Sequence, residues 1–189
     1  MAVLDIAQIG HPVLRELARP VPVQDIGTAQ VQQLIDDMIE TMRHADGAGI
    51  AANQVFRPVR ICILEVADNP RYPYKPNIPL TVLINPELEP IGTDTFDNYE
   101  GCLSVPNLRG LVARTTQVRI RALDREGNAI DTVARGLASG TYQHEVDHLD
   151  GKLFVDRVAD PTTLCTWQEF KNHHEQRFIA SIQPLLEVG

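Results

Sequence analysis

The sequence predicts an α+β fold in a single domain over residues 1–189, with small mixed or antiparallel sheets around a central motif helix and one helix near each end. Three observations predict this class. An apolar stripe with helical spacing fills residues 29–45, strand-like segments follow, and two helical patterns come last. This order of elements is typical of α+β proteins, and 189 residues are enough to bury one sizeable core.

The N-terminal part predicts an extended arm and then a helix. Residues 1–25 contain GHPVLRELARPVPV, whose three prolines cannot donate backbone hydrogen bonds. From about residue 29 to 45 a helix is predicted, with Thr28 as its N-cap and Gly47 as its stop. Its apolar stripe consists of Val31, Leu34, Ile35, Met38, Ile39 and Met42.

The middle of the chain predicts strands. Residues 59–66 and LTVLINP (80–86) are expected to be strands, and ADNPRYPYKPNIP (67–79), with four prolines, is a loop between them. QVRIRALD (117–124) alternates apolar and polar residues, and REGN turns it back into AIDTVA (129–134). This pair is a predicted β-hairpin.

Two helices are predicted at the C-terminal end. The first is the motif helix, from about Leu137 to Asp150. The second, over about 161–186, opens at Pro161 and is ended or kinked by Pro184. Its apolar residues are Leu164, Trp167, Phe170, Phe178 and Ile182, and Cys165 is expected inside it.

Composition and charge exclude several classes of function. Apolar residues make up 43% and charged residues 22%, which is typical of a globular protein. The net charge of -8 argues against direct nucleic-acid binding, because phosphates need a basic surface. No secretory signal and no apolar run long enough for a membrane are visible. Three cysteines without a signal predict a reducing compartment: the cytoplasm, or an organellar matrix or stroma.

The stretch QHEVDHLDG (143–151) predicts a metal site on a helix. His144 and His148, four residues apart, differ by roughly 40° in azimuth and about 6 Å in rise, so both can direct a nitrogen at one ion. Glu145 is turned about 100° from His144. This HExxH arrangement places the glutamate where a general base for a metal-activated water belongs.

Spacing alone leaves the third ligand open. The metzincin pattern requires a histidine where this chain has Phe154. A zinc metalloprotease of the thermolysin kind would use a downstream glutamate, and Glu169 and Glu175 both have suitable spacing. Cys102, flanked by Gly101 in a short segment between predicted strands, would complete an ordinary catalytic set of one cysteine and two histidines.

A non-catalytic module with a structural metal is the third alternative. A closed structural site needs four protein ligands. His173 and His174 are the late candidates for the fourth, and Glu145 would then have no role.

Three stretches occur in a characteristic order: GAGIAANQ (47–54), EGCLS (100–104) and QHEVDHLDG (143–151). Together they resemble the three signature motifs of the peptide deformylases. The resemblance extends to IGHPVLRELARPV and SVPNLRGLVARTTQVRIRALD and covers roughly residues 4–158. It implies a metal-dependent hydrolase that removes the formyl group from the N-terminal formylmethionine of newly made proteins and releases formate.

The resemblance also implies the roles of individual residues. Cys102, His144 and His148 match the metal ligands, which in the family hold one Fe²⁺ that Zn²⁺, Ni²⁺ or Co²⁺ can replace. Glu145 matches the catalytic glutamate, which accepts the water proton and passes it to the leaving nitrogen. The side-chain amide of Gln54 and the backbone N–H of Leu103 match the donors to the oxyanion.

Substrate contacts are expected around the same motifs. An extended peptide would add like a strand against the backbone of Ala48, Gly49 and Gly101. The candidates for an apolar slot that takes the methionine side chain are Ile50, Leu137, Gly140 and Thr141. Gly140 stands where a larger residue is common in the family, and we expect it to widen this slot.

Three charged residues near the motifs, Glu100, Arg114 and Asp147, are interpreted as supports for the cysteine segment and the helix, with solvated surface charges as the alternative.

The expected partners are N-formylmethionyl nascent peptides. In some bacterial members of the family a basic C-terminal helix docks on the ribosome. Here the C-terminal stretch is not basic, because its charged residues are Lys171, Arg177, Glu169, Glu175 and Glu187. The ribosome is therefore kept as a possible partner, but docking through this helix is not predicted.

Overall fold

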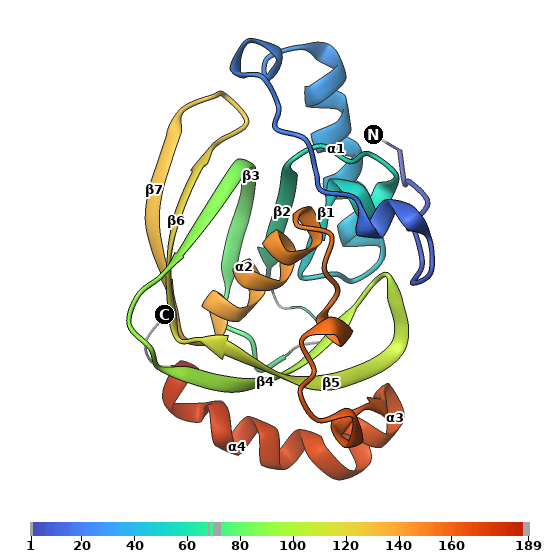
Figure 1. Cartoon of the computed structure of the whole chain (residues 1–189), viewed down its shortest axis with the longest axis vertical. Helices are drawn as coiled ribbons and strands as arrows, with labels where there is room; N and C mark the ends of the chain where they lie inside the picture. Colours follow the sequence, from blue (N-terminus) through green and yellow to red (C-terminus); the bar gives the residue numbers. More distant parts are fainter. Residues whose placement is uncertain (1, 68, 70–72, 187–189) are drawn as a thin grey trace.

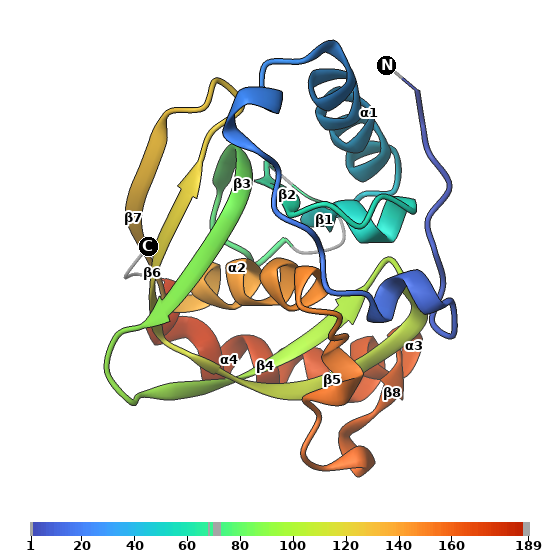
Figure 2. The same ribbon diagram turned by 45° about the horizontal axis from the view of Figure 1, so that its top comes forward.

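Two antiparallel sheets enclose the helix α2 (Gly136–Leu149) in the computed structural model of the chain (Figures 1 and 2). The structure describes residues 2–67, 69 and 73–186. The strands of the first sheet, in spatial order, are β1 (Gly49–Ala51), β2 (Ile61–Val66), β3 (Ile78–Pro90), β6 (Gln117–Leu123) and β7 (Ala129–Arg135). Those of the second are β4 (Thr95–Cys102), β5 (Val105–Thr115) and β8 (Cys165–Thr166). The predicted α+β class is confirmed.

The remaining elements are helical. They include α1 (Ala29–His44) and a C-terminal helical segment, in which α3 (Trp167–Glu169) continues through the π-helical η6 (Phe170–His174) into α4 (Glu175–Leu186). Short 3-10 turns are η1 (Pro12–Arg15), η2 (Val23–Asp25), η3 (Ala52–Val55), η4 (Phe154–Asp156) and η5 (Pro161–Thr163). None of the helices in the described part of the chain combines the length and apolar character that crossing a bilayer requires.

Alternation along β2 explains how helices come to cover both faces of the first sheet. Ile61 and Ile63 pack with the apolar stripe of α1, whereas Cys62 and Leu64 face the cluster that contains Val146 of α2. Successive strand residues point to opposite faces, so the buried residues of this one strand contribute to two cores. The second sheet closes over the other side of α2, and α4 lies along β4 and β5 (Figure 2).

Several predicted elements are confirmed with small shifts in their bounds. They are α1, β2, the β6–β7 hairpin and α2. Thr28 caps α1 by accepting a hydrogen bond from the backbone N–H of Val31. The predicted stop at Gly47 is displaced by one residue: Asp46 takes the left-handed conformation (φ 50), and the N–H of Gly47 donates to the carbonyl of Met42.

The β4–β5 hairpin is the main element that the sequence analysis missed. Cys102, expected between strands, is instead the last residue of β4. The buried side of β4 carries the polar residues Asn98 and Glu100, so apolar alternation is absent. Pro106 and Gly110 likewise interrupt the apolar pattern of β5.

The predicted C-terminal helix is wrong at its start. Pro161 opens only the turn η5, and the chain then extends at Leu164 so that Cys165 pairs with Arg109 of β5. The helix begins at Trp167, and Pro184 lies inside α4 rather than at its end. Pairing with a strand edge is a tertiary contact that a proline at a helix start does not reveal.

The predicted loop 67–79 lies partly outside the described residues. Strand β3 begins at Ile78, before the predicted residue 80, and continues to Pro90. It passes through an irregularity next to Asn85, which has a φ of 53. The N-terminal arm is extended as predicted apart from the turns η1 and η2.

Gly151 follows the C-terminal end of α2 and lies against the N-terminal arm. A substitution there tests how much this close contact contributes to stability. The φ of Gly151 is +69, and an added Cβ would lie 2.7 Å from the carbonyl oxygen of Arg15. Gly127 is the matched control, because its φ is +86 but nothing lies within 4 Å. Both alanine variants incur backbone strain of about 1–3 kcal/mol. Gly151→Ala should lose about 1–3 kcal/mol more from the close contact. Urea unfolding of both variants measures the difference, and equal losses would contradict it.

Candidate metal centre

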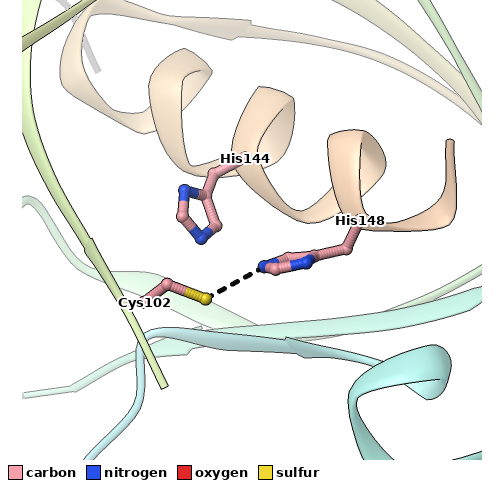
Figure 3. Close-up of side chains that lie close together, drawn as sticks. All are labelled: Cys102, His144 and His148. Atoms are coloured by element: carbon pink, nitrogen blue, oxygen red, sulfur yellow. Dashed lines mark hydrogen bonds between the residues drawn. The ribbon is translucent and has the colours of Figure 1, made fainter. Parts of the chain in front are cut away.

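Three side chains meet beside α2. His144 and His148 project from successive turns of this helix, and Cys102 reaches them from the end of β4 (Figure 3). One ligand atom from each of the three lies within 4.8 Å of the others, and Cys102 Sγ is 3.2 Å from His148 Nε2. A thiolate with two imidazoles is a donor set typical of zinc and of other transition metals. The residues therefore fit a single divalent cation.

The surroundings of Cys102 favour its thiolate form. Burial raises the pKa of the thiol, but the charge of His148 and hydrogen bonds from His144 and His148 outweigh it and hold the pKa well below its ordinary value. The backbone N–H of Ser104 (3.4 Å) and the side-chain amide of Gln54 (3.5 Å) also donate to the sulfur. The thiolate is the form of cysteine that binds metal.

A buried ionic network orients His144. Glu100 Oε2 accepts from His144 Nδ1 at 2.8 Å, which leaves Nε2 available for an ion. Arg114 donates to both oxygens of Glu100 (2.7 and 2.9 Å) and to Asp147 Oδ2 (2.6 Å). Burial opposes ionisation of Glu100, but Arg114 and His144 hold its pKa far below the ordinary value. These charges are supports, not solvated surface groups. Arg157, which the sequence analysis missed, also pairs with Asp147.

His148 is held through its backbone. Asn53, fully buried in η3, donates a hydrogen bond from Nδ2 to the carbonyl oxygen of His148. Within the described part of the chain, Asn53 Oδ1 and His148 Nδ1 have no hydrogen-bond partner. The loop of the first motif is thereby joined to the second histidine of the helix.

Glu145 has one oxygen available for chemistry. The residue is 4% exposed, and no described residue offers a hydrogen bond to its Oε2. Burial raises the pKa of Glu145, against the opposing charges of His144 and His148. Gly49 of β1 lies against the carboxylate, since a Cβ there would be only 2.4 Å from Oε1. Glycine is thus required by the close approach of β1 to α2.

The predicted oxyanion donors also lie at this site. Gln54 is held by its Oε1, which accepts from the N–H of Ala51 at 2.8 Å, and its Nε2 donates to Ser104 Oγ at 3.0 Å. Leu103 directly follows Cys102. Its carbonyl oxygen accepts a hydrogen bond from Gln8 Nε2 at 3.4 Å, and this contact does not involve the backbone N–H of Leu103. Gln54 and Leu103 line the same pocket as Glu100 and Glu145, which lie next to the metal-ligating side chains.

Most of the expected substrate-contact residues line this pocket, namely Ala48, Gly49, Gly101, Gly140 and Thr141. The sequence analysis missed four further lining residues, Lys75, Asn98, Tyr99 and Gly47, the last of which it expected only as a helix stop. Asn98 and Tyr99 directly precede the EGCLS motif, and this position in the sequence could have predicted that they line the pocket. Lys75 comes from the proline-rich loop, for which the sequence offered no placement.

Two of the expected slot residues are placed elsewhere. Ile50 is fully buried in the core beside α1, because strand alternation turns it away from Gly49. Leu137 is buried against Phe170 and Phe178 of the C-terminal segment. Neither side chain lines the pocket, so both assignments are corrected.

Side chains of β4 lie close to Gly140, which was expected to widen the slot. A Cβ at Gly140 would lie 3.1 Å from Asn98 Nδ2 and 3.1 Å from Phe96 Cζ. A side chain at position 140 would require Asn98 and Phe96 to shift by a few tenths of an ångström, and the widening of the slot by Gly140 stays a prediction.

The alternative third ligands lie outside the site. The side chain of Glu169 is 54% exposed and pairs with His173 on the surface. Among the residues that the structure describes, the group of converging metal ligands contains neither Glu169 nor Glu175, and neither His173 nor His174. Within the described residues, the ligands at this site therefore match neither the metalloprotease arrangement nor a four-ligand structural site.

Comparison with known proteins agrees with this geometry. The family model described as polypeptide deformylase matches residues 3–163. A peptide deformylase of Pseudomonas aeruginosa is 47% identical over 177 residues, which cover 94% of this chain and 99% of that protein.

Solved structures are similar over most of the fold. A class I type b peptide deformylase from Acinetobacter baumannii with Met-Ala-Ser bound has a TM-score of 0.80 and 39% identity, covering 83% of this chain and 99% of that one. The peptide deformylase of Thermotoga maritima has a TM-score of 0.75 and 32% identity, covering 85% and 100%. With the ligand trio, the buried glutamate and these similarities in place, the chain belongs to the polypeptide deformylase family.

Proposed function

We propose that this chain is a peptide deformylase, which hydrolyses the N-formyl amide of N-terminal formylmethionine and releases formate. The observation that carries the proposal is the convergence of Cys102, His144 and His148 beside the buried Glu145, in a chain of this family. The similar structure that has Met-Ala-Ser bound supports a peptide with N-terminal methionine as the product.

The cofactor that we propose is one Fe²⁺ per chain, which Zn²⁺, Ni²⁺ or Co²⁺ can replace. Cys102, His144 and His148 would hold it, since thiolate and imidazole suit all four ions. Such a cation supplies Lewis acidity and lowers the pKa of water that it binds. Three protein ligands leave a position open for that water, as in other catalytic sites.

Glu145 would carry the proton. Its free Oε2 can accept a proton from the attacking water and later pass it to the departing amine nitrogen. The raised pKa of this buried carboxyl suits a group that must hold the proton between the two steps. Gln54 Nε2 and the N–H of Leu103 would donate to the oxygen of the formyl group as negative charge develops there.

The peptide would bind in an extended conformation. Strand β1 is an edge of the first sheet, and β4 is an edge of the second. Ala48, Gly49 and Gly101 lie on these two edges and line the pocket, so their backbone groups can pair with an added strand. Gly140 and Thr141 then lie beside the first side chain of the peptide.

The partners that we infer are newly made N-formylated polypeptides, in the cytoplasm or an organellar matrix. The ribosome is a possible partner, but we do not propose docking through the C-terminal helix, because Lys171 and Arg177 are balanced by acidic neighbours. Phe178 and Ile182 of α4 are instead buried against Tyr99.

Formyl-Met-Ala-Ser tests the reaction directly. The enzyme should release formate and free Met-Ala-Ser, because the reacting amide is the formyl one. Formate assay and mass spectrometry of the peptide measure both products. A protease would cut an internal peptide bond without releasing formate, and this result would exclude the proposal.

Glu145→Gln should keep the metal but lower kcat by about 10²–10⁴-fold, since it removes the proton carrier and keeps the shape of the side chain. Steady-state kinetics and metal content of the variant measure the two effects. Unchanged kcat at normal metal content would show that another group transfers the proton.

Cys102→Ser should weaken metal retention, because a hydroxyl is a much poorer ligand than a thiolate. The control is Glu169→Ala, which should retain the metal as the wild type does. Metal content after chelator challenge, measured on protein purified without oxygen, compares the two variants and shows whether the resident ion is iron. Loss of metal from Glu169→Ala but not from Cys102→Ser would favour the metalloprotease instead.

A further inference from the structure

The second histidine of the ligand set lies where α2 ends. His148 is the second-to-last residue of this helix (Figure 3). The ring of His144, one turn earlier, is oriented by Glu100, whereas no described residue offers a hydrogen bond to Nδ1 of His148. Helix ends fray more easily than helix interiors. The imidazole of His148 can therefore keep its position only if the backbone of this last turn is held from outside.

Two other segments hold this end of α2. In the N-terminal arm, the backbone N–H of Ala18 donates to the carbonyl oxygen of Leu149 at 2.9 Å. In η3, the side-chain amide of Asn53 donates from Nδ2 to the carbonyl oxygen of His148 itself, and Asn53 is fully buried, so water does not compete for this contact. Of the two contacts, only that of Asn53 acts on a residue that carries a metal-ligating atom.

The Asn53 side chain is not placed there for stability. A carbonyl only accepts hydrogen bonds, so Nδ2 must face it and Oδ1 must point elsewhere. Within the described part of the chain, this Oδ1 is buried without a partner, and a buried acceptor without a hydrogen bond costs free energy. The carbonyl of His148 also accepts from the backbone N–H of Gly151 at 3.0 Å, so it would stay paired without Asn53. These facts point to a role in positioning.

The turn η3 contacts both sides of the ligand set. Gln54, the residue after Asn53, donates from Nε2 to Cys102 Sγ at 3.5 Å and to Ser104 Oγ at 3.0 Å. Because Asn53 and Gln54 are adjacent in one short turn, their separation is fixed by the backbone. The turn thus connects the end of α2 with the end of β4, where Cys102 Sγ and His148 Nε2 lie 3.2 Å apart.

We propose that Asn53 is a positioning residue of the metal centre, which together with Gln54 sets the separation between the imidazole of His148 and the thiolate of Cys102. Without the donor of Asn53, the last turn of α2 can shift, and the ring of His148 shifts with it. Ligands that are less well placed bind a cation more weakly and release it faster. The inference rests on the proposed metal-dependent function, but its readout is metal retention, which needs no substrate.

Asn53→Leu tests this role, because leucine is close to asparagine in size but has no donor. The Co²⁺-loaded protein is mixed with excess chelator, and the visible absorption of the bound ion is followed with time. The variant should release Co²⁺ about tenfold faster than the wild type. Its spectrum before the chelator is added should also differ, because this absorption depends on ligand geometry. Asn53→Ala, which lacks the same donor, should release Co²⁺ about as fast as Asn53→Leu.

Unfolding in urea separates positioning from stability. It is measured on the metal-free proteins, because a bound metal itself stabilises the fold. The urea midpoint of Asn53→Leu should be no lower than that of the wild type, since the unpaired Oδ1 is removed together with the donor.

Asn85→Leu is the matched control, away from the metal centre. Asn85 joins β3 to the N-terminal arm through two hydrogen bonds with the backbone of Val21, both 2.8 Å long, and its φ of 53 disfavours leucine. This variant should show the opposite pattern: a lower urea midpoint, but release of Co²⁺ at the wild-type rate.

The two proposals fail in different ways. If the wild type binds no divalent cation, or releases no formate from formyl-Met-Ala-Ser, the proposed function is wrong. If the wild type holds Co²⁺ and both Asn53 variants release it at the wild-type rate, the role of Asn53 is overturned. Faster release from Asn53→Leu together with a urea midpoint as low as that of Asn85→Leu would also overturn it, because Asn53 would then only stabilise the fold. If Asn53→Leu does not fold, the release rate of Asn53→Ala decides.

Discussion

The contact between one thiolate and two imidazoles, buried between two sheets, is the interaction on which the site depends. It requires α2 to be enclosed on almost every side, and the two sheets and the C-terminal segment provide this enclosure. Burying so many polar groups is costly unless each is paired. The Glu100–Arg114–Asp147 network offsets that cost and orients His144. The same ion pairs therefore hold α2 in place and set the geometry of the metal ligands.

The remaining unpaired polar atoms gather where chemistry is expected. Asn53 Oδ1, Glu145 Oε2 and His148 Nδ1 are buried without a hydrogen-bond partner in the described part of the chain, and all three belong to residues of the site or its immediate support. Elsewhere buried polar groups are normally satisfied. Of these three residues only Glu145 lines the pocket, so its Oε2 is the unpaired atom that water or a substrate can reach there.

Two sheet edges and one loop define what the pocket can accept. The edges of β1 and β4 offer unpaired backbone groups for an extended peptide. Glycine at position 49 lets β1 approach the buried carboxylate of Glu145, and the loop before β3 brings Lys75 to the pocket lining. Under the proposed function, the edges of β1 and β4 would bind the peptide backbone, and the loop and α2 would line the space for the first side chain.

The sequence by itself determined what depends on local spacing. It located α1, β2, the β6–β7 hairpin and α2, and with them the two histidines and the glutamate, because helical and strand periodicity are local properties. The polar face of β4, the correction of Ile50 and Leu137, and the entry of Lys75 could not be predicted, since each follows from which surfaces meet in space. Spacing alone left Cys102 and Glu169 open as third ligand, and the family resemblance favoured Cys102. The tertiary structure decided between them on physical grounds, because the choice depends on which segment lies against α2 and not on distance along the chain.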